Sequence, residues 1–248
     1  WENKCFGEMT ELIFCEIICM NLDFVGYNGE VAQMKLYLRP DCPFCWKVKI
    51  YLSEIGVDVE EVLVELGKTH PEVAALNPNA TVPVLINEDL VLYESAIIIE
   101  YLADKFPQNS LMSGSPEQKA EIRQLQFYSD SKVGKILFPY IKRVRENTGE
   151  EDIDALKTAI SPDWQKLQKY LSQQLADKAF FGGAFSAADC ALIPRISLAL
   201  AYGLELDEEN GKLTNWLARV MSRPSYLKAK PKGFSIIDEM VKKKNFTI

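Results

Sequence analysis

The sequence is poor in histidine: His70 is the only one among 248 residues. A zinc site would need four ligands at matching spacing, and no second Cys-x-x-Cys pair accompanies Cys42 and Cys45. His70 lies in a surface-like segment, so no histidine base is expected beside these cysteines. We therefore expect no metal, and a reactive cysteine in this chain has to be activated by other means.

Long apolar runs are also missing. No uninterrupted run approaches the roughly 18 residues that a membrane span needs. The nearest candidate, residues 12–15, is bracketed by Glu11 and Glu16, and its acidic flank and lack of a small-residue cleavage site are not typical of a signal peptide. With 48% apolar and 25% charged residues, the chain is expected to be a globular, cytoplasmic protein without a membrane partner.

Positive charge is scarce, with 28 Lys and Arg against 35 Asp and Glu and a net charge of −7. Residues 1–33 hold one lysine and six acidic residues, so the rest of the chain is nearly neutral. Nucleic-acid binding needs a basic stripe, and no nucleic-acid partner is expected. Because the first clear strand begins directly after Met34, we interpret residues 1–33 as an extension. It is either translated from upstream of the natural start or a native amphipathic segment docked on the body.

The chain is organised around the stretch from Pro40 to Cys45. It follows an apolar run at 34–38 and opens a run with helical spacing at 46–55. Unpaired N–H groups and the helix dipole at a helix start stabilise an anion, and the reactive form of cysteine is the thiolate. We therefore predict that Cys42 is an acidic, exposed thiol. Cys45 lies one turn further in, more covered but close enough to form a disulfide.

Apolar periodicity predicts two further parts beyond the extension. Residues 34–107 form an α/β unit in the order β-α-β, α, β-β-α. Residues 108–114 are a polar linker, and residues 115–248 are all-helical with a lysine-rich tail. The helices are predicted at 115–146, at 153–175 with a restart or kink at Pro162, at 190–201 as a buried helix, and around 213–220.

The motifs together amount to a family resemblance. Cys42-Pro43-Phe44-Cys45 resembles a glutaredoxin active site. With Thr81-Val82-Pro83-Val84-Leu85, Glu94-Ser95-Ala96-Ile97 and Ser186-Ala187-Ala188-Asp189 in this order, residues 34–227 resemble a cytosolic glutathione transferase. A cysteine at this place is similar to the omega-like, beta-like, dehydroascorbate-reductase and glutaredoxin-2-like branches. The resemblance implies a thioredoxin-like domain followed by an all-α domain, glutathione as co-substrate and a homodimer.

The resemblance also implies roles for individual residues. Cys42 would be the catalytic thiol and Cys45 an optional resolving thiol. Pro83 would follow a cis peptide bond, which lets Val82 exchange main-chain hydrogen bonds with an extended peptide such as glutathione. Glu94 would pair with the γ-glutamyl ammonium, and Ser95 would hold the neighbouring carboxylate at a helix start.

Further residues in and around the predicted site can be assigned from the sequence. Phe44 joins the glutathione site, and either Lys68 or His70 supplies a cation for the glycyl carboxylate; the sequence leaves that choice open. Lys47 is near Cys42 in sequence and either assists it or points away. Cys190 is read as inert core. The family places an acceptor pocket where three aromatic residues fall, although helical spacing fits core packing as well: Tyr128, Phe138 and Trp164.

We interpret the chain as a glutathione-dependent thiol transferase or reductase that works through a mixed disulfide on Cys42. Two alternatives stay open. One is a glutathione S-conjugating transferase, and the other is a non-catalytic regulator of the stringent-starvation type. The acceptor substrate is not identifiable from sequence.

Overall fold

The computed structural model describes residues 34–65, 68, 70–207, 211–231 and 239. The predicted extension 1–33 and most of the lysine-rich tail lie outside these residues. Among the described helices, none combines the length and the apolar character that a membrane span requires.

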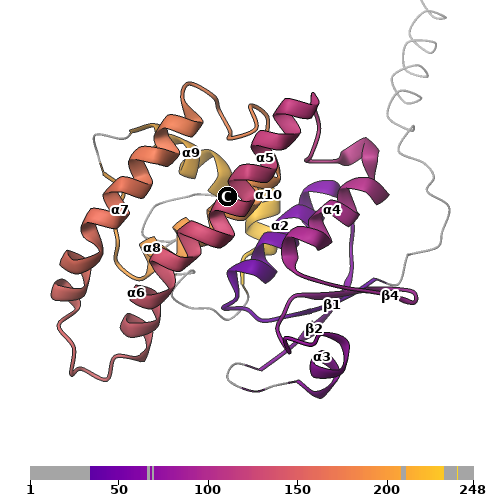
Figure 1. The fold of residues 1–248 in the computed structure, drawn as a ribbon, viewed down its shortest axis with the longest axis horizontal. Helices are drawn as coiled ribbons and strands as arrows, with labels where there is room; N and C mark the ends of the chain where they lie inside the picture. Colours follow the sequence, from indigo (N-terminus) through magenta and orange to yellow (C-terminus); the bar gives the residue numbers. More distant parts are fainter. Residues whose placement is uncertain (1–33, 66–67, 69, 208–210, 232–238, 240–248) are drawn as a thin grey trace, which may run out of the picture. The chain divides into compact units, whose positions relative to one another are not determined.

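The first part of the described chain is an α/β unit. Its elements are β1 (Lys35–Leu38), α2 (Pro43–Ile55), β2 (Glu60–Leu63), α3 (Pro71–Leu76), β3 (Val84–Asn87), β4 (Leu90–Tyr93) and α4 (Ser95–Lys105). The strand order is β2-β1-β3-β4, with β1 parallel to β2 and antiparallel to β3, which is antiparallel to β4. Figure 1 shows α2 and α4 on one face of the sheet and α3 on the other. The predicted thioredoxin-like unit is confirmed.

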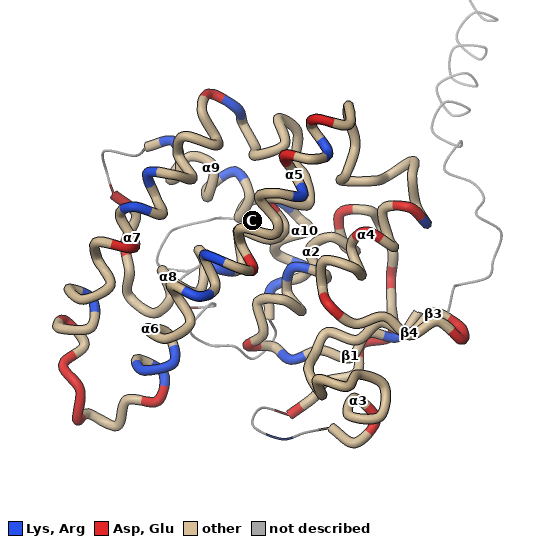
Figure 2. Tube along the Cα trace, in the orientation of Figure 1, with Lys and Arg blue, Asp and Glu red and all other residues tan. Residues whose placement is uncertain are grey.

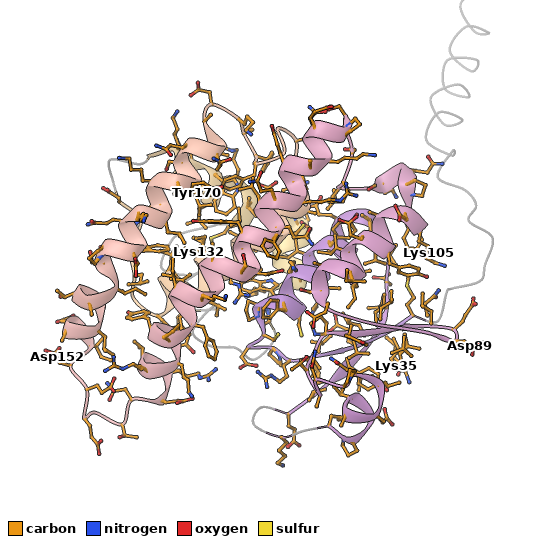
Figure 3. The ribbon with its side chains drawn as sticks, in the orientation of Figure 1. Lys35, Asp89, Lys105, Lys132, Asp152 and Tyr170 are labelled. Atoms are coloured by element: carbon orange, nitrogen blue, oxygen red, sulfur yellow. The ribbon has the colours of Figure 1, made fainter. Side chains whose placement is uncertain are left out.

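The rest of the described chain is helical, as predicted. After the short turn η1 (Pro107–Asn109), it comprises α5 (Pro116–Tyr128), the π-helical turn η2 (Ser129–Val133), α6 (Gly134–Glu146), α7 (Ile153–Leu175), α8 (Ala187–Ala201), α9 (Gly211–Met221) and α10 (Pro224–Ala229). Asp152, labelled in Figure 3, accepts hydrogen bonds from the N–H groups of Asp154 and Ala155 and so caps α7.

Local signals explain where α2 lies. Cys42 is its N-cap and Pro43 its first residue, where the missing N–H of proline costs nothing. Gly56 ends the helix with φ of 73°, a left-handed conformation that glycine adopts without steric cost, and its N–H bonds to the carbonyl of Leu52. Both helix ends agree with the sequence prediction.

Prolines and a π-helical turn mark the two longest predicted helices. The helix predicted at 115–146 is present, because α5, η2 and α6 follow one another without a gap from Pro116 to Glu146, and η2 is a π-helical turn within it. Pro162 does not restart the helix that begins at residue 153, because α7 runs through it without a break.

The core joins the two parts of the described chain. Helix α2 packs against α8 and α10, and nearly every residue of α8 is buried. That confirms the prediction of a buried helix at 190–201. Asp189 in its first turn accepts hydrogen bonds from the N–H of Ser186, the N–H of Phe181 and the indole N–H of Trp216. The buried helix α8 therefore packs against α2, the helix that Cys42 caps.

Candidate active site

Cys42 lies at the junction of two cavities at the start of α2. The sheet-side cleft, about 280 Å³, is lined by residues of the α/β unit, among them Val82, Glu94 and Ser95. The helix-side cavity, about 200 Å³, is lined on its other wall by residues of α6 and α8. Cys42 is only 8% exposed, so the prediction of an exposed thiol is wrong in degree. The thiol reaches solvent through these two cavities.

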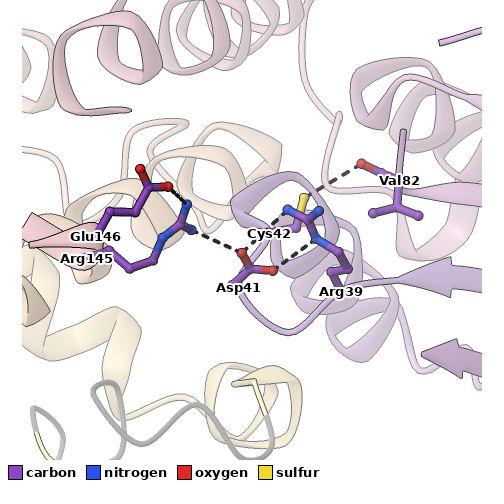
Figure 4. A network of polar contacts seen from close by, with 6 residues as sticks. All are labelled: Arg39, Asp41, Cys42, Val82, Arg145 and Glu146. Atoms are coloured by element: carbon purple, nitrogen blue, oxygen red, sulfur yellow. Dashed lines mark hydrogen bonds and ion pairs between the residues drawn. The ribbon is translucent and has the colours of Figure 1, made fainter. Parts of the chain in front are cut away.

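The surroundings of Cys42 favour its thiolate. The Cys45 thiol, the N–H groups of Cys45 and Phe44, and the positive charge of Arg39 lower the pKa of Cys42 and outweigh its burial. The neutral thiol donates a long hydrogen bond of 3.7 Å to the carbonyl of Val82 (Figure 4). Because Pro43 has no N–H, the first donors of the helix that can face the sulfur are those of Phe44 and Cys45.

The other described cysteines are poor nucleophiles. Burial, and the hydrogen bond that the Cys45 thiol donates to Cys42, raise the pKa of Cys45, which is 1% exposed. Burial also raises the pKa of Cys190, which is fully buried in α8. The two active-site thiols therefore have opposite characters, with Cys42 as the acidic one.

The sheet-side cleft gathers every residue predicted to bind glutathione. Phe44, Lys68, His70, Val82, Pro83, Glu94 and Ser95 all line it beside Cys42. The Val82–Pro83 peptide bond is cis, as the resemblance implied. The cleft thus runs from the thiol along the backbone that precedes β3 to the start of α4.

The start of α4 presents a side chain and a helix terminus to this cleft. Glu94 is exposed and has φ of 66°, which is unusual for a residue other than glycine. Strained backbone of this kind persists where the surroundings hold it, and it is common at ligand sites. Ser95, the first residue of α4, is buried with its N–H at the positive end of the helix.

Lys68 and His70 lie at the other side of the cleft. Lys68 is exposed and forms an ion pair with Glu65. His70 carries a buried Nδ1 that has no hydrogen-bond partner in the described part of the chain, and its ring lies 5.7 Å from that of Tyr37. An orphan nitrogen in a cleft is a site where a ligand group can bind.

The helix-side cavity contains one of the three predicted acceptor residues. Phe138 lines it and is 57% exposed. Tyr128 instead packs on Tyr170, labelled in Figure 3, with ring centroids 4.4 Å apart. Trp164 is buried and donates its indole N–H to the carbonyl of Glu205. Tyr128 and Trp164 do not line the cavity, and their expected role is corrected to helix packing.

Two arginines share one carboxylate at the mouth of the helix-side cavity (Figure 4). Arg39 Nε lies 3.1 Å from Asp41 Oδ1, and Arg145 Nη1 of α6 lies 3.3 Å from Asp41 Oδ2. The Asp41 side chain is only 9% exposed. The contact ties the loop before Cys42 to α6. Arg145 Nη2 also lies 3.3 Å from Glu146 Oε1, so two carboxylates balance the two arginines.

A second, buried group lies beneath Phe44. Lys47 points away from Cys42, and its Nζ donates to Asp130 Oδ2 at 2.7 Å. Arg195 Nη2 lies 3.8 Å from Asp130 Oδ1, too far for a hydrogen bond, and the guanidinium carbon lies 4.3 Å from the centroid of the Phe44 ring. Lys47 is 1% and Arg195 7% exposed, so two buried cations share one carboxylate.

The sequence interpretation missed several charged residues of this site, among them Arg39, Asp41, Arg145 and Arg195. Arg39 and Asp41 flank Pro40 and are close to Cys42 in sequence, which was a usable signal. Arg195 is the only charged residue in an otherwise apolar stretch at 190–201, which was a second signal. Arg145 had none, since nothing in the pattern of α6 tells which of its cations faces the loop before α2.

The described residues contain no group of three or more His, Cys, Asp or Glu side chains placed to hold a metal ion.

Comparisons with known proteins agree with this geometry. The family model described as "Glutathione S-transferase, N-terminal domain" matches residues 36–110, and the one described as "Glutathione S-transferase, C-terminal domain" matches residues 128–224.

Individual relatives carry two different names. The chain is 30% identical over 209 residues to "Stringent starvation protein A homolog" of Haemophilus influenzae, which covers 82% of this chain and 92% of that one. It is 32% identical over 205 residues to "Glutathione S-transferase omega-1" of Sus scrofa, covering 79% and 81%. Among solved structures, a theta class glutathione S-transferase from Xanthomonas axonopodis pv. citri with glutathione bound has a TM-score of 0.72 at 25% identity, covering 80% of this chain and 97% of that one.

Proposed function

Because the chain belongs to the glutathione transferase superfamily, we propose that it is a glutathione-dependent thiol transferase of the cysteine type. One observation carries the proposal: the acidic thiol of Cys42 lies where the sheet-side cleft and the helix-side cavity meet. A sulfur in that place can exchange a glutathionyl group between a ligand in one cavity and a ligand in the other.

The reaction that fits is thiol–disulfide exchange. The Cys42 thiolate attacks the glutathionyl sulfur of a mixed disulfide; a new S–S bond forms, the old one breaks, and the acceptor thiolate leaves with the electron pair and takes a proton from water. The thiolate of a second glutathione then attacks the glutathionyl sulfur on Cys42. Oxidised glutathione leaves, and the Cys42 thiolate is restored.

The proposed contacts with glutathione follow from the charges of the sheet-side cleft. Glu94 pairs with the ammonium of the γ-glutamyl group, and the hydroxyl and N–H of Ser95 hold its carboxylate. The backbone of Val82, next to Pro83, hydrogen-bonds the peptide. His70 takes the glycyl carboxylate, since its Nδ1 is buried without a partner whereas Lys68 already pairs with Glu65.

The test is the mass of the peptide that contains residues 42–45 after exposure of the purified protein to oxidised glutathione, because the chain also carries Cys5, Cys15 and Cys19. In wild type this peptide is expected to gain one glutathionyl group of about 305 Da, which dithiothreitol removes. In Cys42→Ser it is expected to gain none, and in Cys190→Ser, a variant at a buried control cysteine, it is expected to behave as in wild type. Glutathionylation of this peptide that persists in Cys42→Ser would refute the assignment of the thiol.

Two other functions have specific support. Conjugation of glutathione to an electrophile is favoured by the family itself, although a cysteine tends to hold glutathione as a mixed disulfide rather than activate its thiol. Non-catalytic regulation is favoured by the similarity to stringent starvation protein A homologs. Turnover of a glutathionyl mixed disulfide that is lost in Cys42→Ser separates the proposed activity from both.

We also propose a cytoplasmic homodimer. Ile97 of α4 and Phe127 of α5 are 52% and 71% exposed. Each lies three or four residues from a member of the Glu100–Arg123 ion pair that bridges these two helices, so both belong to one surface. A second copy would cover it. Sedimentation is expected to show a dimer for wild type and a monomer for Phe127→Glu; a wild-type monomer would refute this assembly.

A further inference from the structure

The lining of the helix-side cavity is strongly cationic. Arg39, Lys142, Arg145 and Arg195 line it against a single acidic residue, Asp41. This concentration of positive charge contrasts with the net charge of −7 for the whole chain. Figure 2 shows basic positions along α6, the helix that supplies Lys142 and Arg145. A cavity walled by charge of one sign attracts a ligand of the other sign.

Local pairing does not neutralise all of these cations. Asp41 and Glu146 balance Arg39 and Arg145, whereas Arg195 shares Asp130 with Lys47, so this buried group keeps one excess positive charge. Lys142 is exposed on α6 and has no ion pair within the described chain. Buried or half-buried charge without a full partner is costly, and a bound anion would offset that cost.

Arg195 has the strongest requirement for a partner. It is 93% buried, and its Nη2 has no hydrogen bond within the described residues. Phe44 covers one side of the guanidinium, and Gly134 covers another so closely that a Cβ there would lie 3.1 Å from Arg195 Cζ. The start of α6 after the η2 turn thus makes room for this side chain. A donor held this way at a cavity wall is positioned before a ligand arrives.

The remaining wall is apolar. Leu137, Phe138, Ile141, Leu198 and Tyr202 line the cavity together with the ring of Phe44. Such a wall matches the body of an aliphatic or aromatic ligand, while the cations match a charged end.

We propose that the helix-side cavity binds an anionic acceptor, a thiol with an apolar body and a carboxylate that Arg195, Lys142 and Arg145 hold. This inference rests on the proposed function, because thiol transfer is what makes the ligand the leaving thiol of a mixed disulfide. Glutathione occupies the sheet-side cleft during the reaction, so its own carboxylates are bound elsewhere. The released acceptor thiolate lies beside the same cations, which stabilise the charge that develops on its sulfur.

The first experiment measures binding without catalysis. The 248-residue chain is titrated calorimetrically with 4-(methylthio)benzoate and with 4-(methylthio)benzamide, which have the same shape and differ in charge. The benzoate is expected to bind about tenfold or more tightly, as a charge-assisted hydrogen bond provides. Equal affinities would overturn the inference.

The second experiment measures selectivity in turnover. Mixed disulfides of glutathione with 4-mercaptobenzoate, 4-mercaptobenzamide and 4-(aminomethyl)benzenethiol are compared by kcat/KM. The expected order of kcat/KM, from highest to lowest, is acid, amide, amine. The ratio of kcat/KM between two of these substrates is then compared between wild type and each variant, so the intrinsic reactivity of the leaving thiols cancels.

Three variants locate the effect. Arg195→Met and Lys142→Gln are expected to reduce the preference for the acid, and Lys135→Gln, which removes an exposed charge from α6 outside the cavity, is expected to keep it. Lys142→Gln keeps the test decisive if Arg195→Met fails to fold. An unchanged preference in Lys142→Gln, and in any folded Arg195→Met, would overturn the inference.

The two proposals fail separately. Reduction of all three mixed disulfides at matching relative rates in wild type and Arg195→Met would leave the thiol transferase standing and refute the anionic acceptor. Selective binding of the benzoate without any Cys42-dependent turnover would support the anion site and refute the transferase.

Discussion

Replacing Asp130 by asparagine removes the one carboxylate shared by two buried cations. Lys47 Nζ lies 2.7 Å and Arg195 Nη2 3.8 Å from its oxygens, and both side chains are more than 90% buried. The neutral amide leaves two like charges near each other without a counterion. Removing one partner of a buried ion pair costs about 3–5 kcal/mol, and we expect Asp130→Asn to lose that much stability.

Urea unfolding measures this loss. With a slope of about 2–3 kcal/mol per M, a loss of 3 kcal/mol lowers the unfolding midpoint by roughly 1–1.5 M. The matched control is Asp163→Asn, an exposed acid on α7, which is expected to change stability by less than about 0.5 kcal/mol. If Asp130→Asn shifts the midpoint no more than this control, the buried charge argument is wrong.

A double variant separates lost charge pairing from lost packing. Lys47→Met removes one of the two cations that Asp130→Asn leaves without a counterion. The double variant Lys47→Met with Asp130→Asn is therefore expected to lose less stability than the sum of the two single losses, by more than about 1 kcal/mol. Additive losses would contradict a direct interaction between the two side chains.

The stability lost in Asp130→Asn is also expected to depend on pH. Burial lowers the pKa of Lys47, and Asp130 opposes that shift. Between the lowered folded pKa and the unfolded value near 10.4, the unfolded chain binds more protons, so this group makes stability rise with pH. Without Asp130 the folded pKa falls further. The stability difference between wild type and Asp130→Asn is therefore expected to shrink as pH rises towards 10.

Three further predictions concern the thiol and the cleft. Cys42→Ser should abolish thiol transfer in a coupled mixed-disulfide assay and Cys45→Ser should keep a good part of it; equal losses would mean a strictly dithiol route. Glu94→Ala or Ser95→Ala should weaken glutathione binding by about 1–3 kcal/mol in calorimetry without lowering Tm, and unchanged affinity would remove them from the site. The alkylation rate of Cys42 should have its pH midpoint below that of an unperturbed cysteine thiol, because the pKa of Cys42 is lowered in the fold, and Arg39→Ala should raise that midpoint; an unchanged midpoint in Arg39→Ala would contradict the role of Arg39.

The sequence predicted the parts of the fold that depend on local signals. Pro43 and Gly56 mark the two ends of α2, and the order of strand and helix periods gives the α/β unit. The residues around Val82 and Glu94 were found because a family motif carries them, and the cleft that brings them together appears only in three dimensions.

The parts that failed depend on tertiary partners. The η2 turn has no compositional signature, since the helical periodicity continues through it; its extra residue aligns Ser129 with the carbonyl of Ala191 and Gly134 with Arg195, both on a helix about 60 residues away. Likewise, spacing alone could not tell that Phe138 faces the cavity while Trp164 faces Glu205. The helix that packs against each aromatic decides its role.

The different characters of the two active-site thiols bear on how the mixed disulfide is resolved. Resolution within the chain needs the thiolate of Cys45, and burial is the largest cause that raises the pKa of Cys45. Glutathionylation of Cys42 removes the hydrogen bond and the negative charge that raise it further, but the burial stays. A second glutathione arrives from solvent through the helix-side cavity that the acceptor thiol has left, and burial does not raise the pKa of its thiol in water. Attack by glutathione is therefore favoured over attack by Cys45, and the glutathionylated enzyme should be resolved at a rate that increases with glutathione concentration.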